Sequence, residues 1–211
     1  VDDTIVTKEF IALAKDQNVI YCPTLIVSRG YYEAYSALKY GFQYEDPNNV
    51  VDERTKGLLN ASTRFMKYWS SEQYDIDEYL KRSDTYLKER EQIRATNLKL
   101  LYEAGITIAV STDAGNPGTL HGISIYPEMN AMQETGVPPL DIITMATKNG
   151  ALAMDRLDDL GTLEKGKIAD LIVLEKDPSQ TIENMRSISH VMRGGLMRPV
   201  IEAFENTPDK K

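Results

Sequence analysis

The sequence predicts an α/β fold in which part of a parallel α/β barrel is followed by a small β-rich region. Two apolar runs, Val19–Val27 and Ile106–Val110, indicate buried strands, and each is followed by helical patterns. After Met154 the pattern changes to a turn, a strand and a hairpin. A closed barrel needs about eight strands, so we expect this chain to supply only part of one.

The N-terminal region starts with a predicted helix at Thr7–Gln17, because Thr7 can cap it and the apolar residues share one face. The apolar run Val19–Val27 follows as a buried strand. Pro23 interrupts this strand, so its second half must bend or lie where no ladder hydrogen bond is needed. Tyr31–Asn49 is rich in tyrosine, and we expect it to be loosely structured.

Two helical patterns occupy the middle of the chain. The first covers Val51–Trp69, and the second covers Asp75–Ala104, which is long enough for about eight turns. A coiled coil is excluded because Ser83, Arg90 and Asn97 fall where a heptad needs apolar residues.

The stretch Gly105–Gly118 carries the main functional signal. Its apolar strand, Ile106–Val110, leads to Asp113 in a loop of Ala, Gly, Asn and Pro. In α/β barrels and doubly wound sheets, catalytic groups lie at the carboxyl ends of parallel strands. Asp113 is therefore a candidate catalytic residue. Alternatively, it only hydrogen-bonds the loop or caps the next helix.

Helices are predicted downstream at Tyr126–Thr135 and at Pro138–Met154, where proline is tolerated in a first turn. Leu163–Leu174 predicts a turn and a strand, and Ser189–Met197 predicts a hairpin closed by Gly194-Gly195. The predicted division is an α/β part at 1–155, a small β part at 156–205 and a polar tail at 206–211.

Composition narrows the function classes. The net charge of −8 argues against a nucleic-acid partner, because phosphate binding needs a basic face. No run has the length of a transmembrane helix, and the first residues resemble neither a signal nor a transit peptide, so no membrane partner is expected. Cys22 is the only cysteine, which excludes an intramolecular disulfide. This favours a cytoplasmic location and leaves export open.

Three motifs resemble the C-terminal portion of the metal-dependent amidohydrolase superfamily, and especially its imidazolonepropionase and Xaa-Pro dipeptidase (prolidase)-like branch. They are Ser111–Gly115 (STDAG), Pro138–Ala151 (PPLDIITMATKNGA) and Gly161–Leu174 (GTLEKGKIADLIVL). The third motif stands at the distance from the first that the family shows. Asn18–Val27 also resembles the family's seventh barrel strand, so the resemblance covers nearly the whole chain.

The resemblance implies a TIM-like (β/α)8 barrel with a flanking β-sandwich built from both chain ends. It also implies one or two divalent metals, usually zinc, bound by a His-x-His pair, further histidines and an aspartate on the eighth strand. Only the aspartate maps onto this sequence, at Asp113. Val1-Asp2-Asp3 resembles the residues that come directly after the family's sixth-strand histidine. We therefore expect these 211 residues alone to be inactive.

The implied function is hydrolysis of a carbon–nitrogen bond in a small amide, cyclic amide or dipeptide-like substrate. Asp113 would be both metal ligand and proton shuttle. The expected partners are the missing N-terminal barrel segment or another copy of the chain, as in a homo-oligomer. The rival hypothesis is a non-catalytic fragment, or a binding or scaffold module, that lacks the histidine metal centre.

Other candidate site residues lie in or near the same loop. His121, eight residues beyond Asp113, would bind a substrate carboxylate or carbonyl oxygen, or it satisfies loop carbonyls. Thr112 and Asn116 would shape the substrate pocket, or they belong to turn chemistry alone. Glu128 would cap the next helix or hold His121.

Two further features favour a structural interpretation. His190 falls in the predicted hairpin and is expected to be a structural histidine. A cluster of tyrosines suggests either a lid over an apolar substrate or half-buried packing, and the second is favoured. The cluster comprises Tyr31, Tyr32, Tyr35, Tyr40 and Tyr44.

Overall fold

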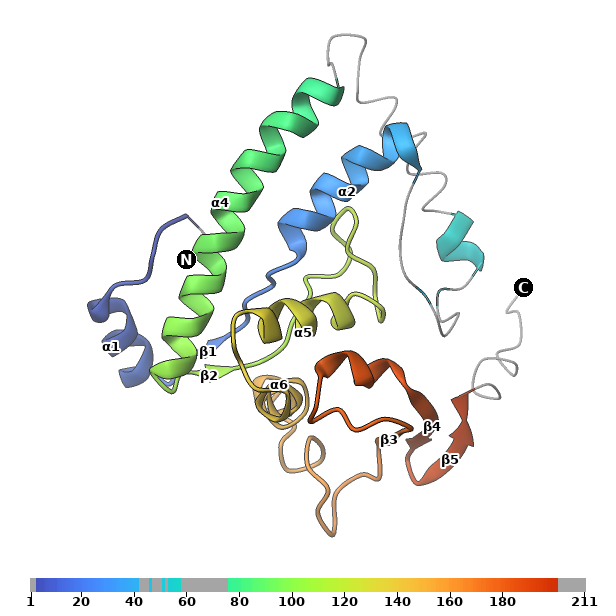
Figure 1. Cartoon of the computed structure of the whole chain (residues 1–211). Coiled ribbons are helices and arrows are strands. Elements are labelled where there is room, and N and C mark those ends of the chain that lie inside the picture. The colour runs from blue at the N-terminus through green and yellow to red at the C-terminus, as the bar shows by residue number, and fades with distance from the viewer. Residues whose placement is uncertain (1–2, 42–45, 47–50, 52, 58–75, 201–211) are drawn as a thin grey trace.

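The structure is a computed structural model that describes residues 3–41, 46, 51, 53–57 and 76–200. Figure 1 shows helices gathered around a short two-stranded sheet, with a separate three-stranded sheet near the C-terminal end. None of the helices in these ranges combines the length and the apolar character needed to cross a membrane.

Helix α1 (Lys8–Asp16) begins where the sequence predicts. The hydroxyl of Thr7 accepts a hydrogen bond from the backbone N–H of Phe10 at 3.2 Å, which satisfies one of the unpaired donors of the first turn. Ala14 is the buried residue of this helix and packs with Leu101 and Ile106 in a small apolar cluster.

Strand β1 (Ile20–Tyr21) is shorter than the predicted strand at Val19–Val27. Pro23 has no N–H to donate to a sheet, and Thr24 has a left-handed φ of +45°, so the chain leaves the extended conformation there. Helix α2 (Val27–Tyr40) then begins. The prediction of a strand is therefore wrong after Tyr21, and the interruption expected at Pro23 is confirmed.

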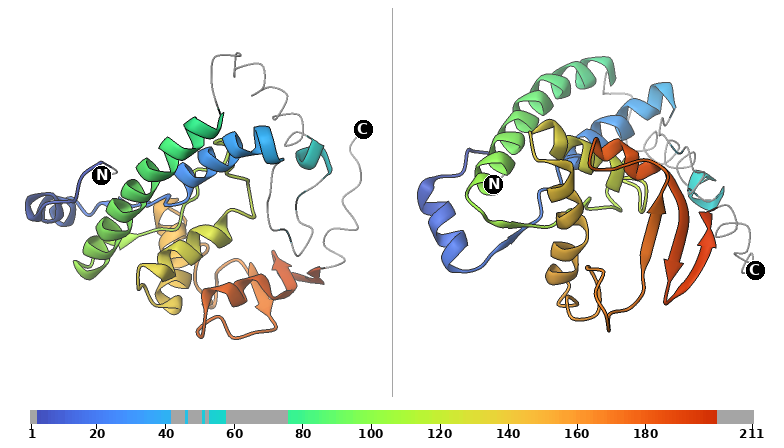
Figure 2. Two further views of the ribbon diagram at one scale, coloured as in Figure 1. Left: turned by 45° about the horizontal axis from the view of Figure 1, so that its top comes forward. Right: turned by 60° about the horizontal axis from the view of Figure 1, so that its bottom comes forward.

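Helix α2 also corrects the expectation that Tyr31–Asn49 is loosely structured, since the residues up to Tyr40 are helical. The helix lies along α4 (Ile76–Glu103) in both orientations of Figure 2, and ion pairs connect the two. Arg29 makes a two-pronged contact with Glu91, with N–O distances of 2.8 Å. Residues 42–45 and 47–50 of the tyrosine-rich stretch lie outside the described residues.

Helix α4 (Ile76–Glu103) confirms the second predicted helix, and Gly105, with φ +76°, follows its end. The helix predicted at Val51–Trp69 lies mostly outside the described residues. Asn97, one of the three polar residues that argued against a coiled coil, is fully buried in α4. Its amide accepts from Val6 N at 2.8 Å and donates to Thr4 O at 2.9 Å, which fixes the segment before α1.

Strand β2 (Thr107–Ile108) pairs in parallel with β1, in the register Ile20–Thr107 and Tyr21–Ile108. The connection between the two strands runs through α2 and α4, because parallel strands need a long crossover connection. The main core combines residues of β2 and α4 with residues from earlier and later in the chain. Its buried residues are Leu25, Leu98, Ile108, Met129, Met132, Val137, Ile142, Met145 and Ile182.

Three helices follow the loop after β2: α5 (Ile125–Glu134), α6 (Pro139–Ala146) and α7 (Lys148–Ala153). Gly136, with φ +95°, separates α5 from α6, and the proline at the first position of α6 needs no N–H partner. Both predicted helix starts are thus found within one residue. The prediction of a single helix over Pro138–Met154 is wrong at Thr147, whose φ of −112° and ψ of −82° separate α6 from α7.

The C-terminal part contains β3 (Leu171–Leu174), β4 (Ile188–Arg193) and β5 (Leu196–Pro199) in one antiparallel sheet. Gly194 and Gly195 both have positive φ, as a two-residue hairpin turn of this kind requires. The 3₁₀ helix η1 (Ile182–Arg186) contacts α5. The right-hand view of Figure 2 shows the sheet beside the helices.

Candidate functional site

The candidate site lies where β1 and β2 end. The last hydrogen bond between the two strands is donated by the N–H of Ala109 to the carbonyl of Tyr21 at 3.0 Å. The next residue, Val110, donates to the carbonyl of Met145 at 3.2 Å and so ties the strand end to α6. Asp113 follows three residues later. The parallel arrangement therefore places Asp113 beyond the carboxyl end of β2, as the sequence predicts.

Asp113 itself is exposed and has φ +50°. Aspartate is enriched in this left-handed region among residues other than glycine. Asp113 does not cap the next helix, because α5 begins at Ile125 with Ser124 at the N-cap position. Its backbone carbonyl, however, takes part in the loop. The arrangement leaves the carboxylate at the surface of the strand end.

Asn116 joins Asp113 to a residue from another element. Its Nδ2 donates to the backbone carbonyl of Asp113 at 2.9 Å. Its Oδ1 accepts a hydrogen bond from the hydroxyl of Tyr31, in α2, at 2.7 Å. Thr112, the residue before Asp113, is half-buried. The structure therefore brings Asp113 and Asn116 together and adds Tyr31, which the sequence placed in a packing cluster.

His121 lies beside the same loop. The Gly115 N–H donates to the carbonyl of Thr119, and the Thr119 N–H donates to the carbonyl of Asn116, so residues 115–119 form a closed turn. The Nε2 atom of His121 lies 3.7 Å from the point where a side chain at Gly115 would start. His121 is exposed, so its ring can meet a molecule that approaches the loop.

The loop packs closely against α2. A Cβ atom placed on Gly118, which has φ +76°, would lie only 2.0 Å from the carbonyl oxygen of Gly30. A Cβ on Gly30 would lie 2.8 Å from Oγ1 of Thr119. Both positions therefore require glycine, and this contact fixes the distance between the loop and the residue next to Tyr31.

Glu128 has a role that the sequence did not predict. Its side chain in α5 is fully buried, and its two carboxylate oxygens accept the backbone N–H groups of Leu25 and Ile26 at 2.9 and 3.0 Å. The interpretation of Glu128 as a cap or as a partner of His121 is therefore wrong. Burial raises the pKa of Glu128 to about 7, against the opposing effects of the two amides and of Arg94.

No local pattern indicated this contact, since 103 residues separate Glu128 from Leu25. A glutamate in the first turn of a helix is ordinarily exposed, and its charge interacts favourably with the helix dipole. Only the packing of α5 on the segment between β1 and α2 turns it into a buried acceptor.

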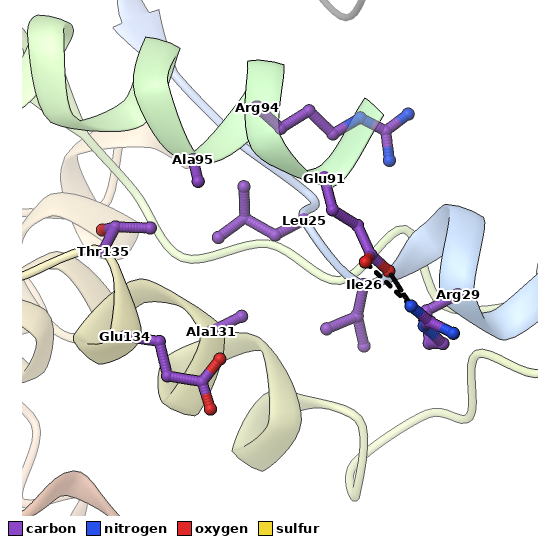
Figure 3. Close-up of a pocket in the computed structure, with 9 residues that line it drawn as sticks. All are labelled: Leu25, Ile26, Arg29, Glu91, Arg94, Ala95, Ala131, Glu134 and Thr135. Carbon is purple, nitrogen blue, oxygen red and sulfur yellow. Dashed lines mark hydrogen bonds and ion pairs between the residues drawn. The ribbon is translucent and has the colours of Figure 1, made fainter. Parts of the chain in front are cut away.

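A pocket of about 350 Å³ lies between α2, α4 and α5 (Figure 3). The ion pair of Arg29 and Glu91 stands on one side of it, and Glu134 of α5 stands on the other. Neither Asp113 nor His121 lines this pocket. It is therefore a feature of the helical layer, separate from the loop after β2.

The remaining predicted residues lie elsewhere. His190 is in β4, where it pairs with Val173 and Pro199, and its Nδ1 lies 3.1 Å from Oγ of Ser189. It is thus in the C-terminal sheet and not in the loop that carries Asp113. Of the tyrosine cluster, Tyr44 lies outside the described residues.

The described residues do not form a complete metal site by themselves. Among them, no group of three His, Cys, Asp or Glu side chains is placed so that it could hold a metal ion. A catalytic zinc usually takes three ligands from protein. Asp113 offers one carboxylate. The part of the chain that the structure describes can therefore supply one ligand to such an ion at this site.

Comparison with known proteins identifies one family, the amidohydrolases. The sequence profile of the amidohydrolase family matches residues 68–197. An imidazolonepropionase from Brevibacillus brevis is 32% identical over 98 residues, which are 46% of this chain and 23% of that protein. The chain therefore matches less than a third of the length of this relative.

Two solved structures share the fold. A Xaa-Pro dipeptidase matches 94% of this chain and 39% of its own with a TM-score of 0.60 and 21% identity. Molinate hydrolase matches 94% of this chain and 36% of its own with a TM-score of 0.57 and 22% identity. At these identities the likeness concerns the fold alone.

Proposed function

The chain belongs to the amidohydrolase family, and we propose that it forms the C-terminal portion of a metal-dependent hydrolase that cleaves a carbon–nitrogen bond. The observation that carries this proposal is the position of Asp113. It is an exposed carboxylate that follows the carboxyl end of β2, a strand paired in parallel with β1. That is where barrel enzymes place their reacting groups.

The proposal includes the architecture of the complete protein. In it, β1 and β2 are the last two strands of a TIM-like (β/α)8 barrel, and the sheet β3–β5 is part of a β-sandwich. Residues 1–155 belong to the barrel, 156–205 to the sandwich and 206–211 to a tail. The fold likeness to a Xaa-Pro dipeptidase supports this division.

Asp113 is proposed as metal ligand and proton shuttle. A divalent metal bound at this edge, with zinc as the expected ion, would lower the pKa of a water molecule and polarise the scissile carbonyl. The carboxylate of Asp113 is exposed, so one oxygen can hold a proton and pass it to the leaving nitrogen. The further ligands would come from outside the described residues.

His121, Thr112 and Asn116 are proposed as substrate-facing residues. His121 is exposed beside the loop, and its imidazole can donate to a carboxylate or a carbonyl oxygen. Asn116 lies next to Asp113 through a hydrogen bond. The proposed substrate class is a small amide or dipeptide-like molecule, in agreement with the name of the dipeptidase whose fold is similar.

The proposed partner is the N-terminal barrel segment, or another copy of the chain. Among the described strands, β1 and β2 pair only with each other, so each has one edge without a neighbour. Such edges are templates for further strands. A cytoplasmic location is part of the same proposal and rests on the single cysteine.

A second candidate function is a binding or scaffold module without catalysis. It is favoured by the lack of a three-residue metal-binding group among the described residues. The two functions differ in what Asp113 does, because a scaffold has no need of its charge.

The test is Asp113→Asn in the complete protein at saturating zinc, with hydrolysis of Xaa-Pro dipeptides and cyclic amides as the readout. Loss of the ligand and base is expected to lower kcat by about 10²–10⁴-fold. Asp155→Asn is the control, because Asp155 is also exposed and has a similar φ of +54°. Unchanged hydrolysis by the Asp113 variant would overturn the role of Asp113 and favour the scaffold.

A further inference from the structure

Tyr31 and Asp113 are connected through a single side chain. The amide of Asn116 accepts from the Tyr31 hydroxyl at 2.7 Å and donates to the Asp113 carbonyl at 2.9 Å. An amide has separate donor and acceptor atoms, so both contacts form at the same time. The hydroxyl of a residue in α2 thus fixes the rotamer that holds the backbone of Asp113.

The start of α2 is itself held on two sides. Glu128 of α5 accepts the N–H groups of Leu25 and Ile26 just before the helix begins. Within its first turn, Arg29 makes the two-pronged contact with Glu91 of α4. The start of α2, just before Tyr31, is therefore held by α4 and α5. This restricts the movement of Tyr31 relative to these helices.

The backbone contact next to Tyr31 brings the loop within reach. Gly118 lies so close to Gly30 that neither has room for a side chain. Because Gly30 directly precedes Tyr31, this contact fixes the position of the loop along α2. The Tyr31 hydroxyl can then reach the side chain of Asn116. The contact between Gly118 and Gly30 holds the loop close to α2, and the two hydrogen bonds of Asn116 orient the Asp113 carbonyl.

From these contacts we infer that Tyr31 is a positioning residue for Asp113, acting through Asn116. The inference rests on the function proposed for Asp113. Tyr31 is not assigned a contact with the substrate, since its hydroxyl donates its hydrogen bond to Oδ1 of Asn116. Asp113 has a left-handed backbone, and a rotation there would move its carboxylate away from the reacting atoms. Small displacements of this kind slow catalysis strongly.

The first test is independent of catalysis and uses hydrogen–deuterium exchange of the purified protein. Tyr31→Phe removes the hydroxyl and keeps the ring, and we expect exchange of the Gly115 and Thr119 amides to become about fivefold faster, as the loss of one neutral hydrogen bond allows. Tyr32→Phe is the matched control, the same change one residue along α2, and is expected to leave these amides unchanged.

The second test is a double-mutant cycle on hydrolysis in the complete, zinc-loaded protein. Tyr31→Phe is expected to lower kcat by about fivefold with little change in KM. In an Asn116→Ala background, the same substitution is expected to have no further effect, because the connection is already broken. Additive effects of the two substitutions would show that Tyr31 acts independently of Asn116.

The outcomes separate this inference from the function on which it rests. If Asp113→Asn leaves hydrolysis unchanged, the proposed function fails, while the exchange experiment still decides whether Tyr31 holds the loop. If Asp113→Asn abolishes hydrolysis but Tyr31→Phe behaves like Tyr32→Phe in both tests, the positioning role is overturned. An increase in KM alone for Tyr31→Phe would also overturn it, because it would indicate contact with the substrate.

Discussion

The carboxylate of Glu128 binds the backbone N–H of Leu25 at 2.9 Å, although 103 residues separate the two in the sequence. The second oxygen binds the next N–H, that of Ile26. One side chain of α5 thereby binds the two backbone N–H groups that directly precede α2. A buried carboxylate in this role makes the stability of the fold depend on pH.

The first prediction concerns that dependence. Because burial raises the pKa of Glu128 from 4.5 to about 7, the folded state binds a proton between these values that the unfolded state releases. The contribution of this group to stability is therefore most favourable below pH 4.5, and it decreases as pH rises to about 7. The decrease amounts to about 3 kcal/mol.

Urea unfolding between pH 4.5 and 8 measures this effect. Glu128→Gln cannot ionise, so its free energy of unfolding should lack this decrease, although one of the two amides loses its acceptor. Glu134→Gln, an exposed change in the same helix, should follow the wild-type curve. Parallel curves for wild type and Glu128→Gln across this range would contradict the assignment.

The second prediction tests the contact between the loop and α2. Gly118→Ala is expected to lower the free energy of unfolding by about 3 kcal/mol or more, because the new methyl group meets the Gly30 carbonyl in addition to the strain of a positive φ. Gly122 has a similar φ of +80° with open space around it. Gly122→Ala should therefore cost about 1 kcal/mol, and equal losses in thermal unfolding would count against the contact.

The third prediction concerns Asn97, which ties the segment before α1 to α4. Asn97→Leu keeps the volume but leaves the Val6 N–H and the Thr4 carbonyl without this partner, and should lower stability by about 2–3 kcal/mol. Gln92→Leu, at an exposed position of the same helix, should change it by no more than about 0.5 kcal/mol. Chemical denaturation distinguishes the two, and similar values for both would show that the buried amide contributes nothing.

The fourth prediction concerns the start of α1. Thr7→Ala removes the hydroxyl that accepts the Phe10 N–H and should cost about 1 kcal/mol. Thr7→Ser retains an acceptor at the same place and should preserve most of the stability. If the alanine and serine variants unfold at the same denaturant concentration, the cap has no energetic role.

Local patterns in the sequence were sufficient for several elements. The hydroxyl of Thr7, the glycine after α4 and the pair Gly194-Gly195 each satisfy a need that arises within a few residues. The predicted helices at α1, α4, α5 and α6 and the hairpin of β4 and β5 are accordingly confirmed. The position of Asp113 after a parallel strand also follows from local pattern, since an apolar run followed by a polar loop was enough to indicate it.

The errors occurred where tertiary contacts decide the structure. The chain leaves the sheet at Pro23 and Thr24, the N–H groups that follow at Leu25 and Ile26 bind Glu128, and α2 is helical where it packs on α4. Neither partner is near in sequence, so no local pattern could reveal them. For the same reason, the tyrosine cluster carried no sign that Tyr31 reaches the Asp113 loop.

The sequence by itself thus determined the family, most helix ends and the candidate carboxylate, because these depend on residue order over short distances. Only the tertiary structure decided what surrounds that carboxylate. Tyr31 and Gly30 both belong to α2, and they contact the loop that carries Asp113 only because α2 packs against it in the folded chain. Hydrogen bonds and steric contacts act over a few ångströms of space, whatever the distance along the chain.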